Sequence, residues 1–98
     1  TGLEVRQITG GMLVQQTDSH RLTEDMLRIV TSRKPTDDEV HEMLFAWTVC
    51  KHVKSNAIVL AAGGRTIGVG AGQMNRVDSV RIAAMRAERF SLPVEGSV

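Results

Sequence analysis

The sequence predicts an α/β fold, and three features carry that prediction. Residues 36–53 have the spacing of an amphipathic helix. Residues 57–60 form a continuous apolar run, which a two-glycine turn joins to a second strand-like segment. Residues 76–90 form a second helical segment with a face of small side chains. A strand that is apolar throughout is typical of the interior of an α/β sheet that is covered on both faces.

The first third of the chain gives weaker signals. Residues 12–14 (Met-Leu-Val) predict a short strand that is entered through Gly10-Gly11. Residues 18–21 are polar and turn-like. The apolar run at residues 27–30 predicts either a second strand or an extended segment.

The helix predicted at residues 36–53 begins with a recognisable start signal. Residues 36–39 (Thr-Asp-Asp-Glu) match the capping box, and their acidic side chains suit the positive end of the helix dipole. Its apolar stripe consists of Val40, Met43, Leu44, Trp47 and Cys50. The opposite face, with His41, Glu42 and Lys51, is expected to be solvated.

Glycines organise the segment that follows. Gly63-Gly64 suits a hairpin turn because both positions can adopt positive φ. Residues 65–69 should return antiparallel, and Gly68 within them indicates a bulge or a close backbone approach.

The second helix is expected to start at an Asn75 cap, with Asp78 as its third residue, and to end near Phe90. Its predicted packing face consists of Val77, Val80, Ala83, Ala84 and Ala87.

Composition excludes several classes of protein. The 98 residues carry 12 basic and 11 acidic side chains, a balance that argues against a nucleic-acid partner. No apolar run approaches the roughly 20 residues of a membrane helix. The single cysteine, Cys50, excludes an internal disulfide or multi-cysteine zinc site and is expected to be a core residue. A single cysteine also fits a location in the reducing cytoplasm. The chain starts without methionine and stops without a closing helix, so we expect a piece of a longer protein.

Residues 54–81 hold the candidate site, because their few polar side chains fall at the ends of elements. Those side chains are Ser55, Asn56, Gln73, Asn75 and Arg76. The glycines at 68–72 do not form GxGxxG, since Gln73 stands at the third glycine position, and no P-loop lysine follows. A strand-to-helix corner rich in glycine can bring backbone amides to a ligand, or can simply be a tight corner. Asn56 likewise either caps backbone groups or holds a ligand.

Two other pairs of residues are expected to carry no chemistry. His41-Glu42 does not continue as HExxH, because Phe45 stands at the second histidine position. Lys51 and His52 are adjacent on a helix and diverge by about 100°, so they would not converge on one substrate atom. We expect Lys51 to be solvated and His52 to be partly packed.

Two long segments, VKSNAIVLA and TIGVGAGQMNRVDSVRIA, carry a resemblance to a known family. They resemble the transformylase region of the bifunctional AICAR formyltransferase/IMP cyclohydrolase family, and GGMLVQQ, LRIVTSRKPT and FAWTVCKHVKSN fit the same pattern. The resemblance implies a zinc-free, cytidine-deaminase-like mixed sheet flanked by helices, of which residues 1–98 form a partial domain. It also implies formyl transfer from formyl-tetrahydrofolate to the ribonucleotide AICAR during purine (IMP) synthesis. The parent would be a cytoplasmic homodimer that also has cyclohydrolase activity.

The same resemblance assigns roles to particular residues. Asn56 and Arg76 would contact the ribonucleotide, and Val77 would lie against the folate. These types are chemically suitable, because an amide can orient a carboxamide and an arginine can pair with an anionic group. A potassium ion is implied through backbone oxygens of Val49, Val53, Ser55 and Ala57. The family's catalytic Lys-His pair lies upstream, so no catalytic residue is expected in residues 1–98.

Two rival interpretations remain. The chain could be a non-catalytic nucleotide-binding α/β module that keeps the glycine corner without chemistry. It could also be a purely structural α/β subdomain, in which case replacing Asn56 or Arg76 would leave ribonucleotide affinity unchanged.

Overall fold

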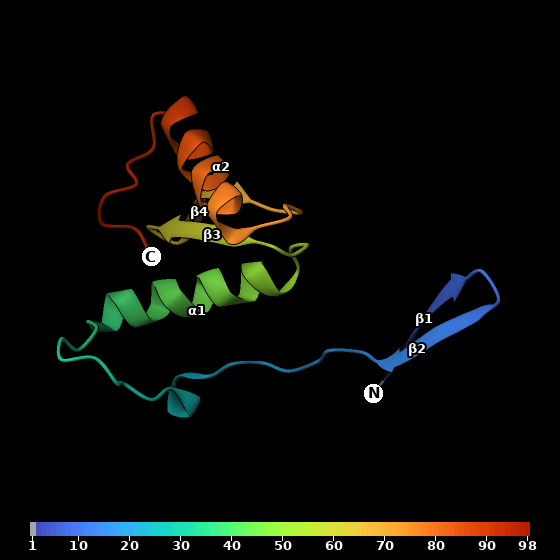
Figure 1. Ribbon diagram of the computed structural model, residues 1–98. Coiled ribbons are helices and arrows are strands. Elements are labelled where there is room, and N and C mark those ends of the chain that lie inside the picture. Colours follow the sequence, from blue (N-terminus) through green and yellow to red (C-terminus); the bar gives the residue numbers. More distant parts are fainter. Residues whose placement is uncertain (1) are drawn as a thin grey trace.

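A computed structural model describes residues 2–98 of the chain and contains two β-hairpins and two helices (Figure 1). The elements in order are β1 (Leu3–Ile8), β2 (Gly11–Gln16), the 3-10 turn η1 (Glu24–Met26), α1 (Asp37–Lys51), β3 (Ile58–Ala62), β4 (Arg65–Gly70) and α2 (Arg76–Arg89). β1 pairs with β2, and β3 pairs with β4, both antiparallel and in separate two-stranded sheets. The predicted α/β class is confirmed.

Hairpin β3–β4 lies between the two helices, with α1 on one face and α2 on the other (Figure 1). Gly63 and Gly64 form its turn with φ of 61° and 72°, as predicted from their sequence. The pairing register shifts between Leu60 and Ala61, and Leu60 pairs with Gly68 at that point. The predicted irregularity at Gly68 is therefore confirmed.

Helix α2 packs directly on the backbone of β4. A Cβ atom added to Gly68 would collide with the Ala83 carbonyl oxygen, and one added to Gly70 would collide with the Ser79 carbonyl oxygen. Both glycines are therefore required by the close approach of helix and strand. This geometry also accounts for the small side chain of Ala83, which is buried.

The packing face of α2 differs from the predicted one. Ser79, Ala83 and Ala87 are buried at four-residue spacing, whereas 58% of Val77 and 47% of Val80 are exposed. The prediction was wrong for Val77 and Val80 because it assigned only apolar residues to the packing face and so left out Ser79. The Ser79 hydroxyl donates a hydrogen bond to the Asn56 carbonyl, so this serine can be buried without leaving an unpaired polar group. The contact of α2 with β4 is therefore lined by three small side chains.

Helix α1 starts as predicted, with Thr36 and Glu39 forming a complete capping box. It ends at Lys51, two residues before the predicted end. Glu42, expected to be solvated, instead accepts a hydrogen bond from the Gly64 N–H at 2.7 Å, and its other carboxylate oxygen is buried.

The reason lies in the two sides of α1. Phe45, Ala46 and Val49 share the face of Glu42 by helical spacing, and all three are partly buried. The predicted stripe that contains Val40 and Trp47 instead faces segment 22–35 and lines a cavity there. The helix therefore has apolar residues on two sides, and a single-stripe prediction found one of them.

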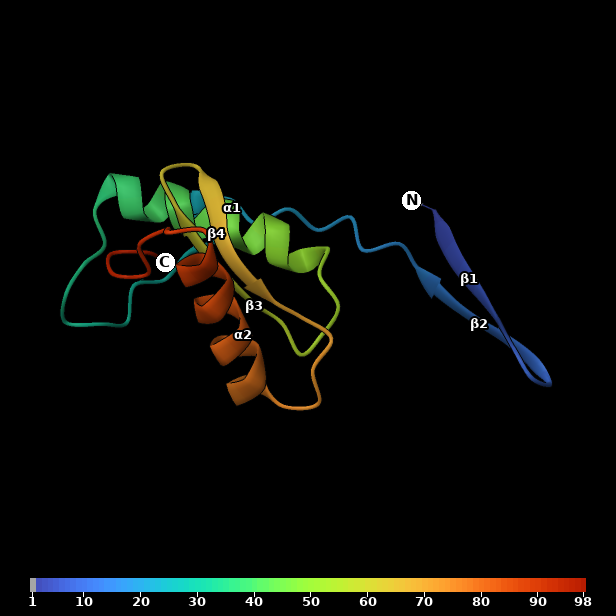
Figure 2. The ribbon, with the colours of Figure 1, turned by 90° about the horizontal axis from the view of Figure 1, so that it is seen from above.

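Hairpin β1–β2 extends away from the rest of the chain (Figures 1 and 2). The strand predicted at residues 12–14 is confirmed within β2, whereas β1 was not predicted. Residues 27–30 adopt no regular strand, which leaves the extended alternative. The radius of gyration is 16.3 Å, against about 13 Å for a compact domain of this length, and the protruding arm accounts for this difference.

The other end of the chain returns to the sheet. Val98 and Ala61 exchange both backbone hydrogen bonds, at 2.8 and 2.9 Å, so residue 98 occupies the outer edge of β3. Neither helix within residues 2–98 has the length and apolar character needed to cross a bilayer.

Candidate functional site at the glycine corner

The candidate site lies where β3 begins and β4 ends. Because the two strands are antiparallel neighbours, the loop before β3 and the loop after β4 meet at the same end of the hairpin. Two backbone hydrogen bonds join these loops. The Gly72 N–H donates to the Lys54 carbonyl at 2.8 Å, and the Asn56 N–H donates to the Gln73 carbonyl at 3.1 Å.

Asn56 is anchored through its backbone on both sides. Its N–H is held by Gln73, and its carbonyl accepts a hydrogen bond of 2.6 Å from the Ser79 hydroxyl. Within residues 2–98 its side-chain amide makes no hydrogen bond, although the residue is half-buried. Asn56 is thus fixed by its backbone rather than by its amide, which leaves the amide available to a ligand.

Arg76 is the first residue of α2. The side chain of Asn75 caps this helix by accepting from the Asp78 N–H at 2.9 Å, as predicted. Arg76 is exposed and forms no ion pair with another residue in the range 2–98. Its guanidinium and the positive end of the helix dipole therefore favour an anion or a carbonyl oxygen at this corner.

Val77 adds an apolar surface beside Arg76. More than half of Val77 is exposed, and Met74, in the loop before the helix, is 98% exposed. The corner thus brings together an unengaged amide, a guanidinium and exposed apolar side chains. Such a mixture suits a ligand that has both a polar and an apolar part.

Lys51 and His52 lie at the far end of α1 and do not form a pair. The Lys51 ammonium donates to the His20 carbonyl at 2.7 Å and lies 3.6 Å from Asp18, with 20% of its side chain exposed. His52 is exposed at the helix C-cap. As predicted, the two side chains do not converge, but Lys51 is not solvated, because residues 18–20 cover it, and His52 at the helix end is exposed rather than partly packed.

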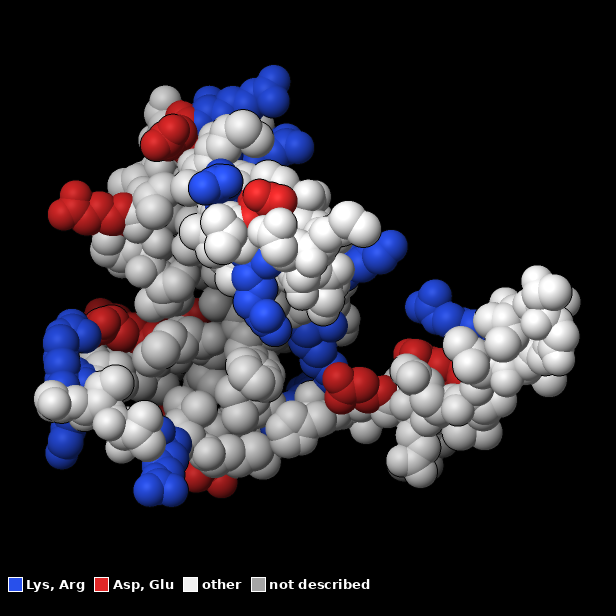
Figure 3. Space-filling view, in the orientation of Figure 1, with Lys and Arg blue, Asp and Glu red and all other residues white. Residues whose placement is uncertain are grey.

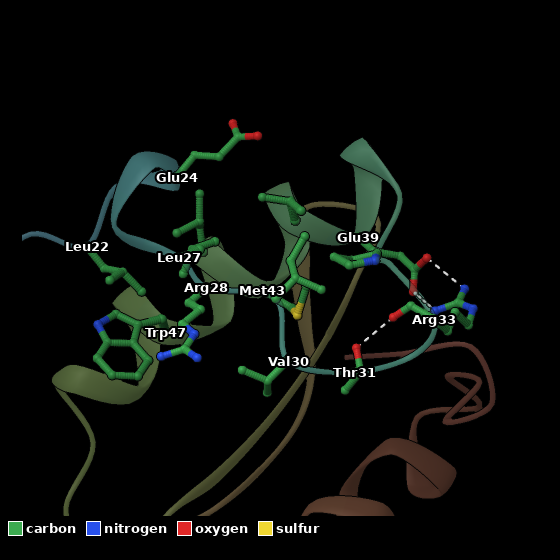
Figure 4. A pocket seen from close by; sticks show the side chains of 14 residues that line it. Leu22, Glu24, Leu27, Arg28, Val30, Thr31, Arg33, Glu39, Met43 and Trp47 are labelled. Atoms are coloured by element: carbon green, nitrogen blue, oxygen red, sulfur yellow. Dashed lines mark hydrogen bonds and ion pairs between the residues drawn. The ribbon is translucent and has the colours of Figure 1, made fainter.

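A cavity of about 580 Å³ lies elsewhere, between α1 and segment 22–35 (Figure 4). Trp47, Met43 and Val30 line it, and at one end the Arg33 guanidinium pairs with Glu39 at 2.8 and 3.1 Å. Its walls are mainly apolar, and its one paired cation and carboxylate satisfy each other. None of the three predicted ligand-binding residues lines this cavity, so the glycine corner remains the candidate site.

Comparison with known proteins decides the family. The model of the AICARFT/IMPCHase bienzyme family matches residues 1–86, which include Asn56, Arg76 and Val77. The chain belongs to this family. The resemblance inferred from the sequence is therefore confirmed.

Two relatives of this AICARFT/IMPCHase chain are close in sequence. The "Bifunctional purine biosynthesis protein PurH" of Roseobacter denitrificans is 60% identical over 104 residues, which cover 99% of this chain and 20% of the relative. The protein of the same name from Caulobacter vibrioides is 58% identical over 96 residues, which cover 98% and 18%. The chain thus spans about a fifth of the length of these relatives.

One residue that shapes the site, Ser79, and one that supports the opposite end of hairpin β3–β4, Glu42, could not be recognised from the sequence. A single serine within a helix, such as Ser79, has no motif of its own, and its only signal is four-residue spacing with Ala83 and Ala87. Glu42 was missed because a carboxylate on the second face of α1 reads as solvated until the Gly64 turn is placed beside it.

Proposed function

We propose that residues 1–98 supply one wall of the ribonucleotide and folate site of an AICAR formyltransferase in purine (IMP) biosynthesis. The parent protein, a transferase and hydrolase, would move a formyl group from formyl-tetrahydrofolate to the exocyclic amine of AICAR. Family membership supports this reaction, and the names of the two relatives place them in purine biosynthesis. The single observation that carries the site is the joining of the Asn56 loop to the start of α2 through the Gln73 carbonyl.

The proposed roles follow from chemistry at the corner. The Asn56 amide offers both a donor and an acceptor, which suits the carboxamide and amine of AICAR. Arg76 would hold an anionic or carbonyl oxygen of the same ligand, and Val77 would provide an apolar wall for the folate ring. No residue in this segment is proposed as the acid or base of the reaction.

We also propose a potassium ion at the end of α1. The donors fit such an ion chemically, because neutral backbone oxygens suit potassium, and one of them lies in the last turn of α1, at the negative end of the helix. The oxygens would be those of Val49, Val53, Ser55 and Ala57. One bond already uses this region, since the Val49 carbonyl accepts from the His52 N–H at 3.0 Å. When bound, the ion would fix the loop that precedes Asn56.

The proposed parent is a cytoplasmic homodimer, and its site would be completed by parts of the protein other than residues 1–98. Neither a nucleic acid nor a membrane is a proposed partner. In support, the chain carries 12 basic and 11 acidic side chains, so it has almost no net positive charge to attract nucleic acid.

The test uses a chain of the relatives' full length that carries residues 1–98 in the matching segment, hereafter the full-length protein. Formyl transfer is followed with AICAR and formyl-tetrahydrofolate. Wild type should be active, and Asn56→Ala should raise KM for AICAR by about tenfold or more, because a buried polar contact to the ligand is lost. Residues 1–98 alone should give no turnover.

The two rival interpretations predict other results. A non-catalytic nucleotide-binding module would bind AICAR but leave the full-length protein without formyl transfer. A purely structural subdomain would leave KM for AICAR unchanged in Asn56→Ala.

A further inference from the structure

Ser79 is the fully buried polar residue of the core formed by residues 2–98, with 0% of its surface exposed. It lies on α2, one turn after Arg76, on the face that packs against β4. A buried hydroxyl needs a hydrogen-bond partner, and that of Ser79 donates to the Asn56 carbonyl at 2.6 Å. The residues joined by this bond are 23 positions apart in sequence.

The helix that carries Ser79 has little room to move. The backbone of α2 at Ser79 touches Gly70 so closely that a Cβ atom there would overlap the Ser79 carbonyl oxygen. A second contact of the same kind joins Gly68 and Ala83 one turn later. The position of the Ser79 hydroxyl is therefore set by helix-to-strand packing and not by the loop before α2.

The same bond completes a clamp on Asn56. Gln73, in the loop before α2, accepts from the Asn56 N–H at 3.1 Å, and Ser79, inside α2, donates to the Asn56 carbonyl. Both backbone groups of Asn56 are thus tied to the segment that also presents Arg76. The clamp fixes where the Asn56 side chain leaves the backbone relative to the start of α2, which carries Arg76.

We propose that Ser79 is a positioning residue for the ribonucleotide, setting the separation and direction of Asn56 relative to Arg76. This inference rests on the proposed function, because it assumes that both residues hold the same ligand. Ser79 itself touches no substrate in this proposal. It holds the peptide of Asn56 in place, so its loss should weaken ribonucleotide binding more than folate binding.

The experiment measures KM for AICAR, KM for formyl-tetrahydrofolate and kcat in the full-length protein. Ser79→Ala removes the donor without adding bulk and should raise KM for AICAR by about tenfold, because the displaced Asn56 amide would lose about one hydrogen bond to the ligand. KM for the folate should stay within about twofold. A merely structural role would instead lower the yield of active protein and leave both KM values unchanged.

Ser97→Ala is the matched control. Ser97 also donates from its hydroxyl to a backbone carbonyl at 2.6 Å, that of Val94, but it lies near the end of the chain and outside the corner. Its removal should leave both KM values unchanged. Ser79→Cys keeps a weaker donor and should give a smaller rise in KM for AICAR than Ser79→Ala. If Ser79→Ala does not fold, KM for AICAR in Ser79→Cys is compared with that in Ser97→Ala instead.

A double mutant separates this inference from the proposed function. In an Asn56→Ala background, Ser79→Ala should add less than about twofold to KM for AICAR, because the side chain that it positions is already gone. If Asn56→Ala raises KM for AICAR while neither Ser79 variant does, the positioning role is overturned and the proposed function stands. If Asn56→Ala and Arg76→Ala both leave this KM unchanged, the proposed site fails, and the role of Ser79 fails with it.

Discussion

Hairpin β1–β2 is exposed along its whole length, whereas hairpin β3–β4 is held between α1 and α2 (Figures 1 and 2). Both are antiparallel pairs of short strands closed by tight turns that contain glycine. Their surroundings differ completely. Glu4 and Arg6 are the charged residues of segment 3–16, and the face of this hairpin seen in Figure 3 is mostly uncharged. Its large apolar side chains are exposed.

This difference explains why the candidate site lies on the second hairpin. A two-stranded hairpin in water is marginally stable at best, so it cannot hold side chains within the small tolerances that ligand binding requires. Hairpin β3–β4 is fixed by α1 through Glu42 and by α2 through the glycine contacts. The loops at its end inherit that rigidity, and Asn56 is held there.

The largest expected effect comes from a glycine in each hairpin. Gly70→Ala places a methyl group against the Ser79 carbonyl and should destabilise the full-length protein by about 3 kcal/mol, the cost of overpacking a tight contact. Gly11→Ala, where no atom lies within 4 Å of the added carbon, is the matched control and should change stability by less than about 0.5 kcal/mol. Urea unfolding checks both. Equal effects would contradict the account of helix-to-strand packing.

The second largest effect on stability compares Glu42 of α1, which bonds to the turn of hairpin β3–β4, with Glu4 of hairpin β1–β2. Glu42→Ala removes the acceptor of the Gly64 N–H and should cost about 2 kcal/mol, as expected for a hydrogen bond to a charged group. Glu4→Ala, which removes an exposed contact of 3.2 Å to Gln15, should cost almost nothing. The same unfolding experiment measures both variants. A neutral Glu42→Ala would mean that α1 does not support the turn.

The smallest effect concerns the start of α1. Hydrogen bonds from Arg33, and then from the Thr36 backbone, lower the pKa of Glu39 from 4.5 to about 2. Because the folded-state pKa is depressed, the ionised carboxylate adds stability above about pH 4.5, and this stability is lost as the pH falls toward 2. Arg33→Ala should raise this pKa, which carboxyl NMR titration measures. Arg28→Ala is the control, and an equal shift there would contradict the assignment.

Much of the second hairpin could be predicted from the sequence, because its signals are local. The Gly63-Gly64 turn, the apolar run that became β3 and the Asn75 cap each depend on neighbours in the chain. The first hairpin was half missed: Leu3 and Val5 alternate with Glu4 and Arg6 as in a strand, but the alternation covers only four residues before Gln7 breaks it, which is too short a signal to stand alone.

The parts of the site that could not be predicted depend on contacts between distant segments. Ser79 meets Asn56 and Lys51 meets His20 only after the chain folds, and nothing in a serine or lysine of a helix indicates such a partner. The roles of Asn56, Arg76 and Val77 came from family resemblance. They stay predictions until ligand binding is measured.

The measurement that tests the central claim most directly is AICAR binding to the full-length protein by calorimetry, with Arg76→Ala compared against Arg89→Ala. Both arginines are exposed on α2, one at its first residue and one at its last. If the glycine corner holds the ribonucleotide, Arg76→Ala should weaken binding by about tenfold or more, and Arg89→Ala should leave it unchanged. Equal affinity in wild type and Arg76→Ala would contradict the account.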